Sequence, residues 1–315
     1  MAGEKTIAIV GATGAQGGAL ARAVLAAEGP FRARAVTRRP DSEAAQRLAS
    51  MGAEVVQADL DDVGSLVRAF EGAHGAFCLT NFWEHMSADK EKAQAENLAE
   101  AAKRAGVAHA IWSTFTDTRA YLPIDDDRMP VLQGRYNVPH FDAKGEAHGD
   151  FTERGVPTTF LVTSFYWENF ILLGAGPKRG EDGVLVLAMP LGDAKLPAIA
   201  VEDIGRIALS VFERRDEYIG RTVGVAGEHL TGEQMARHLA EALGEEVRYL
   251  AMSADAYRGL GFPGADEMGN MYQFVRDFND VYVAERDLDE CRTLHPRLTD
   301  FRSWLAENAK RIPLD

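Results

Sequence analysis

The chain has 315 residues, of which 46% are apolar, and this is enough to build the core of one large α/β domain with a smaller lobe. Its 48 acidic and 34 basic residues give a net charge of −14, which argues against direct binding of nucleic acid, because that binding depends on basic contacts to phosphate. No segment is long and apolar enough to cross a bilayer, and the N-terminus leads directly into an apolar strand, so neither a membrane protein nor a secreted one is expected.

The first predicted strand ends at Val10 and leads into a glycine-spaced turn that opens a helix over 16–28. Its GxxGxxG pattern suits a tight turn at the first glycine, close approach of phosphate at the second and close packing of helix on strand at the third. Because a helix start attracts anions, the pattern predicts a dinucleotide site rather than an ordinary glycine turn. The predicted cofactor residues here are Gly11, Ala12, Thr13, Gly14, Ala15, Gln16 and Gly17.

The second predicted strand, over 31–36, is followed by Thr37, Arg38 and Arg39. A site specific for NAD would carry an acidic residue here for the ribose 2′-hydroxyl. Guanidinium groups instead match a 2′-phosphate. We therefore predict that Arg38, the first after the strand, and Arg39 bind NADP(H), which is preferred over NAD(H); the alternative is that both arginines are solvated in a loop.

Strands and helices alternate through the first half of the chain. Strands are predicted over 53–58, 75–79, 108–113 and 158–163, and helices over 62–70, 87–105 and roughly 142–154. This rhythm predicts an α/β fold with a Rossmann-type, doubly wound parallel sheet, whose ligands gather at the carboxyl ends of the strands. Six residues at those ends are predicted to contact the cofactor: Asp59, Leu60, Thr80, Asn81, Phe82 and Ser113.

Several of these assignments have a structural alternative. Asp59 can equally serve as a turn or cap residue beside Asp61 and Asp62, and Asn81 is a common turn residue. The loop over 121–139 is rich in Asp, Pro and Gly and is interpreted as either a mobile flap or a surface excursion.

A helix is predicted to carry Tyr136, His140 and Lys144 on one face, because they are spaced four residues apart. A lysine near the nicotinamide ribose can bind its hydroxyls and lower the pKa of a neighbouring acid. A solvated amphipathic helix explains the spacing equally well. After the sixth strand, Tyr166, Trp167, Glu168 and Asn169 are predicted to contact the cofactor, with core packing as the alternative.

The rhythm breaks at Pro177, so we predict a nucleotide-binding domain over 1–176 and a smaller α+β lobe for substrate or partner over 177–315, with strands of the second half free to extend the first sheet. The lobe is expected to hold a hairpin over 184–190, a helix from Val201, a capping box from Thr231, a strand over 247–250 and a terminal helix over 299–311. An apolar cluster is expected to form core at Met268, Met271, Tyr272 and Phe274.

The two cysteines, Cys78 and Cys291, lie far apart and without the spacing of a metal site. They predict buried thiols in a reducing, cytoplasmic compartment, with no metal bound.

Five segments in order, VGATGAQGG, TRR, TNFWE, HFDAKGE and FYWEN, resemble an NmrA-like protein over nearly the whole chain. These proteins are atypical short-chain dehydrogenase/reductases, and the likeness is greatest to the redox-sensor branch that binds NADP(H). The resemblance implies a phosphate loop at 11–16, the 2′-phosphate arginine at Arg38 and the nicotinamide-ribose lysine at Lys144. It also implies adenine-side contacts at Asp59 and Leu60, central contacts at 80–82 and a further segment at 166–169.

Two features depart from that branch. A lysine of the sensor proteins falls on Ala93, with Lys90 and Lys92 nearby, and the loop before His140 is longer. Active short-chain reductases carry YxxxK, whereas the first position here is His140, whose side chain has a suitable pKa for proton transfer. Lys144, His140 and Tyr166 are therefore the predicted catalytic residues, with Ser113 or Thr114 placed to orient a carbonyl.

These observations predict a regulator that responds to NADP(H), or alternatively an NADPH-dependent oxidoreductase of quinones, enones or carbonyl compounds. The first requires different affinities for the nucleotide states. The second requires a proton donor beside the nicotinamide. The expected partners are the nucleotide and either a small substrate or another protein, and the chain is free to form oligomers.

Overall fold

The computed structural model describes residues 4–314 and divides into two compact units that interleave along the chain. The first unit comprises the chain up to Asp117, His140–Thr163 and Glu202–Val223. The second comprises Thr118–Pro139, Ser164–Val201 and the chain from Gly224 onward. The units interleave because later segments of the chain return to the sheet of the first unit.

The first unit is built on a seven-stranded sheet in the order β11-β6-β5-β4-β1-β2-β3. Neighbouring strands among β1 to β6 are parallel, and the strand order reverses between β1 and β4. This is a Rossmann-type, doubly wound sheet, as predicted, and β11 is the strand that it takes from the second half of the chain. The strands are β1 (Lys5–Val10), β2 (Phe31–Thr37), β3 (Glu54–Gln57), β4 (Gly75–Cys78), β5 (His109–Thr114), β6 (Thr158–Val162) and β11 (Thr222–Gly224).

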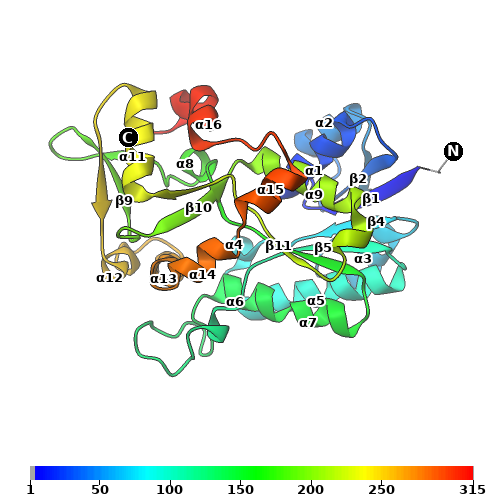
Figure 1. Cartoon of the computed structure of the whole chain (residues 1–315). Coiled ribbons are helices and arrows are strands. Elements are labelled where there is room, and N and C mark those ends of the chain that lie inside the picture. The colour runs from blue at the N-terminus through cyan, green and yellow to red at the C-terminus, as the bar shows by residue number, and fades with distance from the viewer. Residues whose placement is uncertain (1–3, 315) are drawn as a thin grey trace. The chain divides into compact units, whose positions relative to one another are not determined.

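Helices cover both faces of this sheet, with α3, α5 and α7 on one side and α1, α2 and α9 on the other (Figure 1). The apolar residues of β1 alternate between the faces, and Ala8 and Val10 join the core under α3, α5 and α7 with Trp112 and Phe151. The helices of the unit are α1 (Ala15–Ala26), α2 (Glu43–Ser50), α3 (Val63–Phe70), α4 (Phe82–His85), α5 (Ala88–Arg104), α6 (Pro139–Glu146), α7 (His148–Glu153), α9 (Val201–Glu213) and α10 (Arg215–Tyr218).

The second unit has two three-stranded sheets, in the orders β12-β10-β7 and β13-β9-β8. Its strands are β7 (Phe165–Tyr166), β8 (Lys178–Arg179), β9 (Leu185–Met189), β10 (Lys195–Ile199), β12 (Glu228–Thr231) and β13 (Val247–Ala251). Its helices are α8 (Asn169–Leu172), α11 (Gly232–Leu243), α12 (Ala254–Arg258), α13 (Ala265–Asp277), α14 (Asn279–Ala284), α15 (Leu288–Leu294) and α16 (Phe301–Asn308), with 3₁₀ turns η1 (Thr118–Ala120) and η2 (Ala309–Arg311).

The capping box is confirmed, because Thr231 Oγ1 accepts from the Gln234 N–H and Gln234 Oε1 accepts from the Thr231 N–H. The prediction of a hairpin over 184–190 needs correction, because the antiparallel pair begins earlier, at Lys178. That segment supplies a single strand, β9, whose antiparallel partner is the short β8 and whose other neighbour is the parallel β13. Val186 pairs with a residue of both, so this strand is central in its sheet.

The helix predicted to carry Tyr136, His140 and Lys144 begins only at Pro139, so the expectation for Tyr136 is wrong. Proline suits the first helical turn and pushes the preceding residue away from helical geometry. Tyr136 instead forms a bridge with Leu132 and is buried. His140 and Lys144 remain one turn apart on α6.

The loop over 121–139 is a packed part of the second unit. Asn270 Nδ2 on α13 donates to the carbonyls of Pro130 and Asn137, at 2.8 and 2.6 Å. Gln273 Nε2 donates to the Arg128 carbonyl at 2.7 Å. Because Leu122 and Met129 are buried and two buried amides hold the backbone, the structure shows an ordered segment rather than a bare surface excursion.

Cys78 and Cys291 are free and buried, as predicted. Burial raises the pKa of the Cys291 thiol to about 11. Among residues 4–314, no helix has the length and apolar character needed to cross a membrane. Within the same range, no three His, Cys, Asp or Glu side chains are placed together to hold a metal ion.

Candidate functional site

The glycine turn after β1 has a geometry that only glycine supports at two positions. Gly11 has φ of +64°, and its O accepts from the Gly14 N–H at 2.8 Å. A Cβ on Gly17 would lie 2.5 Å from Gly11 O and 2.6 Å from Val10 O. The first glycine therefore makes the turn and the third allows α1 to pack against it.

The start of α1 fits an anion. Gly14 is its N-cap and has no side chain to accept from the first N–H groups, and the first turn holds no acidic residue. An α-helix leaves those N–H groups without partners inside the helix, and its dipole is positive there. The turn lies where the strand order reverses, next to the carboxyl end of β4, which is where ligands bind such sheets. Binding of a pyrophosphate by residues 11–17 fits this geometry and stays a prediction.

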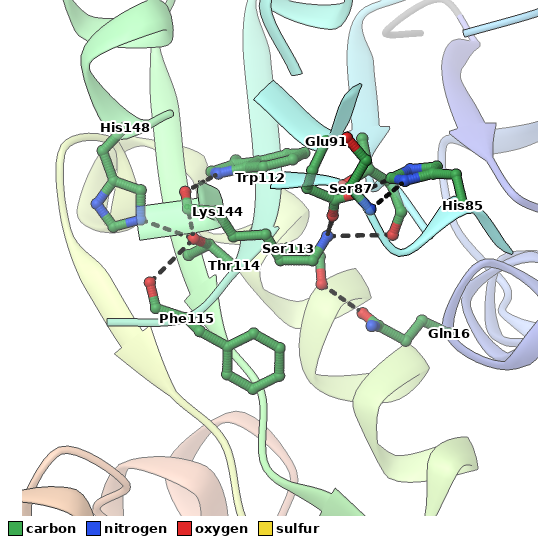
Figure 2. Close-up of polar contacts among 11 residues, drawn as sticks. Gln16, His85, Ser87, Glu91, Trp112, Ser113, Thr114, Phe115, Lys144 and His148 are labelled. Carbon is green, nitrogen blue, oxygen red and sulfur yellow. Dashed lines mark hydrogen bonds and ion pairs between the residues drawn. The ribbon is translucent and has the colours of Figure 1, made fainter. Parts of the chain in front are cut away.

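Two predicted residues meet beside this turn. Ser113, at the carboxyl end of β5, donates from Oγ to Gln16 Oε1 on α1 at 2.7 Å (Figure 2). The structure thus brings together residues of the glycine turn and of the fifth strand.

Lys144 points from α6 to the end of β4 and is buried, with a side chain 9% exposed. Its Nζ lies 2.5 Å from Glu91 Oε1 on α5 and 2.5 Å from Thr80 Oγ1, and it donates to Thr80 O at 3.1 Å (Figure 2). It also lies 5.2 Å from the centre of the Trp112 ring. Predicted residues Thr80 and Lys144 are therefore in direct contact.

The backbone of Lys144 is held as firmly as its side chain. Trp112 Nε1 and Thr114 Oγ1 on β5 lie 3.1 and 3.0 Å from the Lys144 carbonyl and donate to it (Figure 2). His148 Nε2 lies 2.8 Å from Thr114 Oγ1, and burial lowers the pKa of His148 to about 4, so its imidazole is neutral at pH 7. These contacts fix the position of α6 against β5.

Glu91 is a site residue that sequence reasoning missed. It is fully buried, and Thr80 Oγ1 donates to its Oε1 at 2.5 Å, while His85 Nε2 lies 3.3 Å from its Oε2. Burial alone would raise the pKa of Glu91, but the charge of Lys144 and the hydrogen bonds from His85, Lys144 and Thr80 outweigh it and hold this pKa at about 2. The signal was available, because Glu91 falls at helical spacing on the buried stripe of α5 with Ala88, Ala95, Leu98 and Ala102.

The depressed pKa of Glu91 predicts a loss of stability in acid. Between about pH 4.3, the ordinary value for an unfolded glutamate, and about pH 2, the unfolded chain binds more protons at this position than the native one. The contribution of Glu91 is thus complete above this window and is lost as the pH falls through it. Denaturant unfolding at several pH values is expected to show a steeper acid decline for the wild type than for Glu91→Gln; equal slopes would contradict the assignment.

His140 lies among aromatic rings. Its ring centre is 4.5 Å from that of Phe141 and 5.0 Å from that of Trp83, and Phe82 and Phe115 lie at 5.8 and 5.6 Å. The residue is buried. The structure therefore places predicted residues Phe82 and His140 side by side, and it adds Trp83 and Phe115, which sequence reasoning did not select.

The predicted adenine side of the site is exposed. Arg38 follows β2, and its guanidinium forms an ion pair with Glu84 on α4. Arg39 is exposed beside it. Asp59 Oδ1 accepts from the Asp61 N–H at 2.9 Å, so Asp59 does form a turn.

The turn at residues 59–62 is tied to its neighbours. Asp62 caps α3 by accepting from the N–H groups of Gly64 and Ser65. Leu60 O accepts from Asn97 Nδ2 on α5 at 2.8 Å. The capping role that was an alternative for this segment thus falls to Asp62, and adenine contacts of Asp59 and Leu60 stay a prediction.

The position of the sensor-branch lysine is occupied by the exposed Ala93 of α5. The two lysines nearby are both engaged in ion pairs, Lys90 with Asp61 at 2.9 Å and Lys92 with Glu146 at 2.7 Å.

Residues 166–169 belong to the second unit and pack within it. Trp167 is fully buried, with its ring centre 5.3 Å from that of Phe301 and 6.2 Å from that of Trp304. Glu168 accepts from Trp304 Nε1 at 3.0 Å and from the Val201 N–H at 3.1 Å. These contacts are core packing, and a cofactor role for Tyr166, Trp167, Glu168 and Asn169 stays a prediction.

A family model and curated relatives match the chain, and both point to the same family. The family model described as "NmrA-like family" matches residues 3–305. The NmrA-like family domain-containing oxidoreductase malD of Malbranchea aurantiaca is 30% identical, with 99% of each chain covered. The oxidoreductase FrzB of a Cladobotryum species, described in the same words, is 29% identical, covering 88% of this chain and 86% of its own.

Solved structures agree. NmrA, described as a negative transcriptional regulator, is 26% identical with a TM-score of 0.80, covering 98% of this chain and 96% of its own, and it has been solved in complex with NAD. A structure of NmrA with NADP is 25% identical, with a TM-score of 0.79 and the same coverage. The triphenylmethane reductase of a Citrobacter species shares the fold, at 19% identity and a TM-score of 0.75, covering 98% and 99% of the two chains. The chain therefore belongs to the NmrA-like family.

Proposed function

We propose that this protein binds NADP(H), in preference to NAD(H), at the carboxyl end of the first unit's sheet, and acts as a nucleotide-responsive regulator. The glycine turn, the start of α1 and the exposed Arg38 after β2 support the nucleotide site. NmrA, solved in complex with NAD and with NADP, supports a nucleotide of this kind, and the preference for NADP(H) is proposed from Arg38 alone. The regulator would respond to nucleotide through a protein partner or its own oligomeric state.

The observation that favours a regulator rather than an enzyme is the environment of Lys144. Its ammonium is buried and held by Glu91 and Thr80, so its charge is already compensated within the protein. The position where reductases carry tyrosine holds His140, packed among aromatic rings. In this setting Glu91, whose pKa is held at about 2, stays ionised as the counter-charge, and the ammonium can donate hydrogen bonds that bind and orient a ribose.

An oxidoreductase is the second candidate, and the names of malD and FrzB favour it. A bound nicotinamide would supply hydride, and the chain would have to supply a proton to the substrate oxygen of a quinone, enone or carbonyl compound. His140 is the donor placed for this, one helical turn from Lys144, and Tyr166 is the other candidate. The aromatic rings around His140 would exclude water from such a pocket.

NADPH binding and NADPH oxidation separate the two functions. The wild type and His140→Phe, which keeps an aromatic ring among its neighbours, are compared in single-turnover reactions with a quinone, an enone and an aldehyde, after binding is confirmed for each. The regulator predicts binding without oxidation, and hydrogen exchange that differs between the NADPH and NADP⁺ complexes. Oxidation by the wild type that is lost in His140→Phe would establish the reductase instead.

The assignment of Arg38 has its own test. Arg38→Gln is expected to weaken NADP⁺ binding about 5- to 10-fold, because a charge-assisted hydrogen bond to the 2′-phosphate is worth roughly 1.5–3 kcal/mol, reduced here by exposure. NAD⁺ binding is expected to stay within about twofold. Arg32→Gln is the matched control, since Arg32 lies at the other end of β2 and also pairs with a glutamate, Glu4. Equal loss of both nucleotides in Arg38→Gln would overturn the assignment.

A further inference from the structure

The guanidinium assigned to the 2′-phosphate already has an anionic partner. Arg38 donates from an η nitrogen to Glu84 Oε1, and the two side chains are 58% and 46% exposed. Glu84 comes from α4, the short helix that follows β4, so the pair joins the ends of two strands of the sheet. An incoming phosphate must therefore compete with a carboxylate for Arg38.

The surroundings of Arg38 are acidic as well. The hydrogen bond that Arg38 donates to Glu84, together with the charges of Glu84, Asp59 and Asp61, raises the pKa of Arg38 against a smaller opposing effect of burial. Asp61 has a cation of its own, Lys90, at 2.9 Å, and also accepts from Gln94 Nε2 at 3.0 Å. Glu84 is the one of these carboxylates in direct contact with the guanidinium, and it engages one η nitrogen that a 2′-phosphate could otherwise use.

We infer that Glu84 is a specificity-determining residue that competes with the 2′-phosphate of NADP(H) for Arg38 and so restrains the preference for NADP(H) over NAD(H). This inference rests on the nucleotide site proposed above. NAD(H) carries a hydroxyl at the 2′ position, so it binds without separating Arg38 from Glu84. NADP(H) places a second anion on the same guanidinium, so its binding weakens or breaks the contact of Arg38 with Glu84, and that loss is subtracted from its binding free energy.

The test measures dissociation constants of NADP⁺ and NAD⁺ by calorimetry for the wild type and Glu84→Gln. NADP⁺ is expected to bind the variant about 2- to 5-fold more tightly, the effect of removing an exposed ion pair, with NAD⁺ unchanged. The gain is expected to shrink at high salt, because screening weakens the pair that is removed. Glu4→Gln is the matched control: it removes the same charge from an exposed Arg–Glu pair at the amino end of β2, and it should change neither constant.

Arg38→Gln distinguishes failure of this inference from failure of the site. In the double variant Arg38→Gln with Glu84→Gln, the gain for NADP⁺ is expected to disappear. If Arg38→Gln weakens NADP⁺ selectively but Glu84→Gln has no effect, the competition is overturned and the site stands. If Arg38→Gln does not discriminate between the nucleotides, the proposed site itself fails. An equal gain for NADP⁺ and NAD⁺ in Glu84→Gln would reduce the effect to general charge and overturn the inference.

Discussion

Replacing Glu91 with alanine is expected to lower the free energy of unfolding by about 3–5 kcal/mol, because it leaves the Lys144 ammonium buried without its counter-charge. Glu91 is fully buried and lies 2.5 Å from Lys144 Nζ. Thr80 Oγ1 loses an acceptor in the same variant. Urea unfolding followed by circular dichroism measures the change.

Two comparisons keep this prediction specific. Glu96→Ala removes an exposed acid from the same helix, where it pairs with Arg154 at 2.8 Å, and should cost at most about 1 kcal/mol. The double variant Glu91→Leu with Lys144→Met removes both charges and should be more stable than Glu91→Ala. A Glu91→Ala protein as stable as Glu96→Ala would show that the buried pair contributes nothing.

Gly17→Ala is expected to lower the free energy of unfolding by about 1–3 kcal/mol or more and to weaken both NADP⁺ and NAD⁺ about tenfold or more. The new Cβ would lie 2.5–2.6 Å from backbone atoms of Val10 and Gly11, and backbone cannot rotate away as a side chain can. Helix α1 must therefore shift from the turn, and its N-terminal N–H groups shift with it. Calorimetric binding and urea unfolding test both effects.

Gly29→Ala is the matched control for that variant. Gly29 follows α1, has no positive φ, and nothing lies within 4 Å of the position of an added Cβ. Its nucleotide binding should equal that of the wild type, and its free energy of unfolding should equal or exceed the wild-type value by up to about 1 kcal/mol, because alanine reduces the conformational freedom of the unfolded chain. If Gly17→Ala matched Gly29→Ala in binding both nucleotides, the glycine turn would not be the phosphate site.

Most strands and helices of the first unit could be predicted from local sequence patterns. The strand predicted over 31–36 is observed as Phe31–Thr37, and the helix predicted over 62–70 is observed as Val63–Phe70 with Asp62 as its cap. Both have their signals within the segment itself, in apolar runs and capping residues. Strand β11 was beyond such reasoning, because three residues carry no periodicity and their place in the sheet depends on a distant segment.

The candidate site divides in the same way. The turn at Gly11 is encoded within a few residues, so its geometry followed from the sequence. The partners of Lys144 and Arg38 could not be predicted from the sequence. Packing of α5 brings Glu91 to Lys144, and packing of α4 brings Glu84 to Arg38, in each case from a distant position in the chain. The prediction that Tyr136 lies on the same helix was wrong for a local reason. Pro139 sets the start of α6, and the four-residue spacing alone did not take this into account.

Helix α4 has four residues, and all four contact residues of the candidate site. Phe82 and Trp83 lie against His140, Glu84 holds Arg38, and His85 faces the carboxylate that holds Lys144. One turn of backbone thus carries both the carboxylate that pairs with Arg38 and the imidazole beside Glu91, so a substitution that displaces α4 is expected to disturb both contacts together.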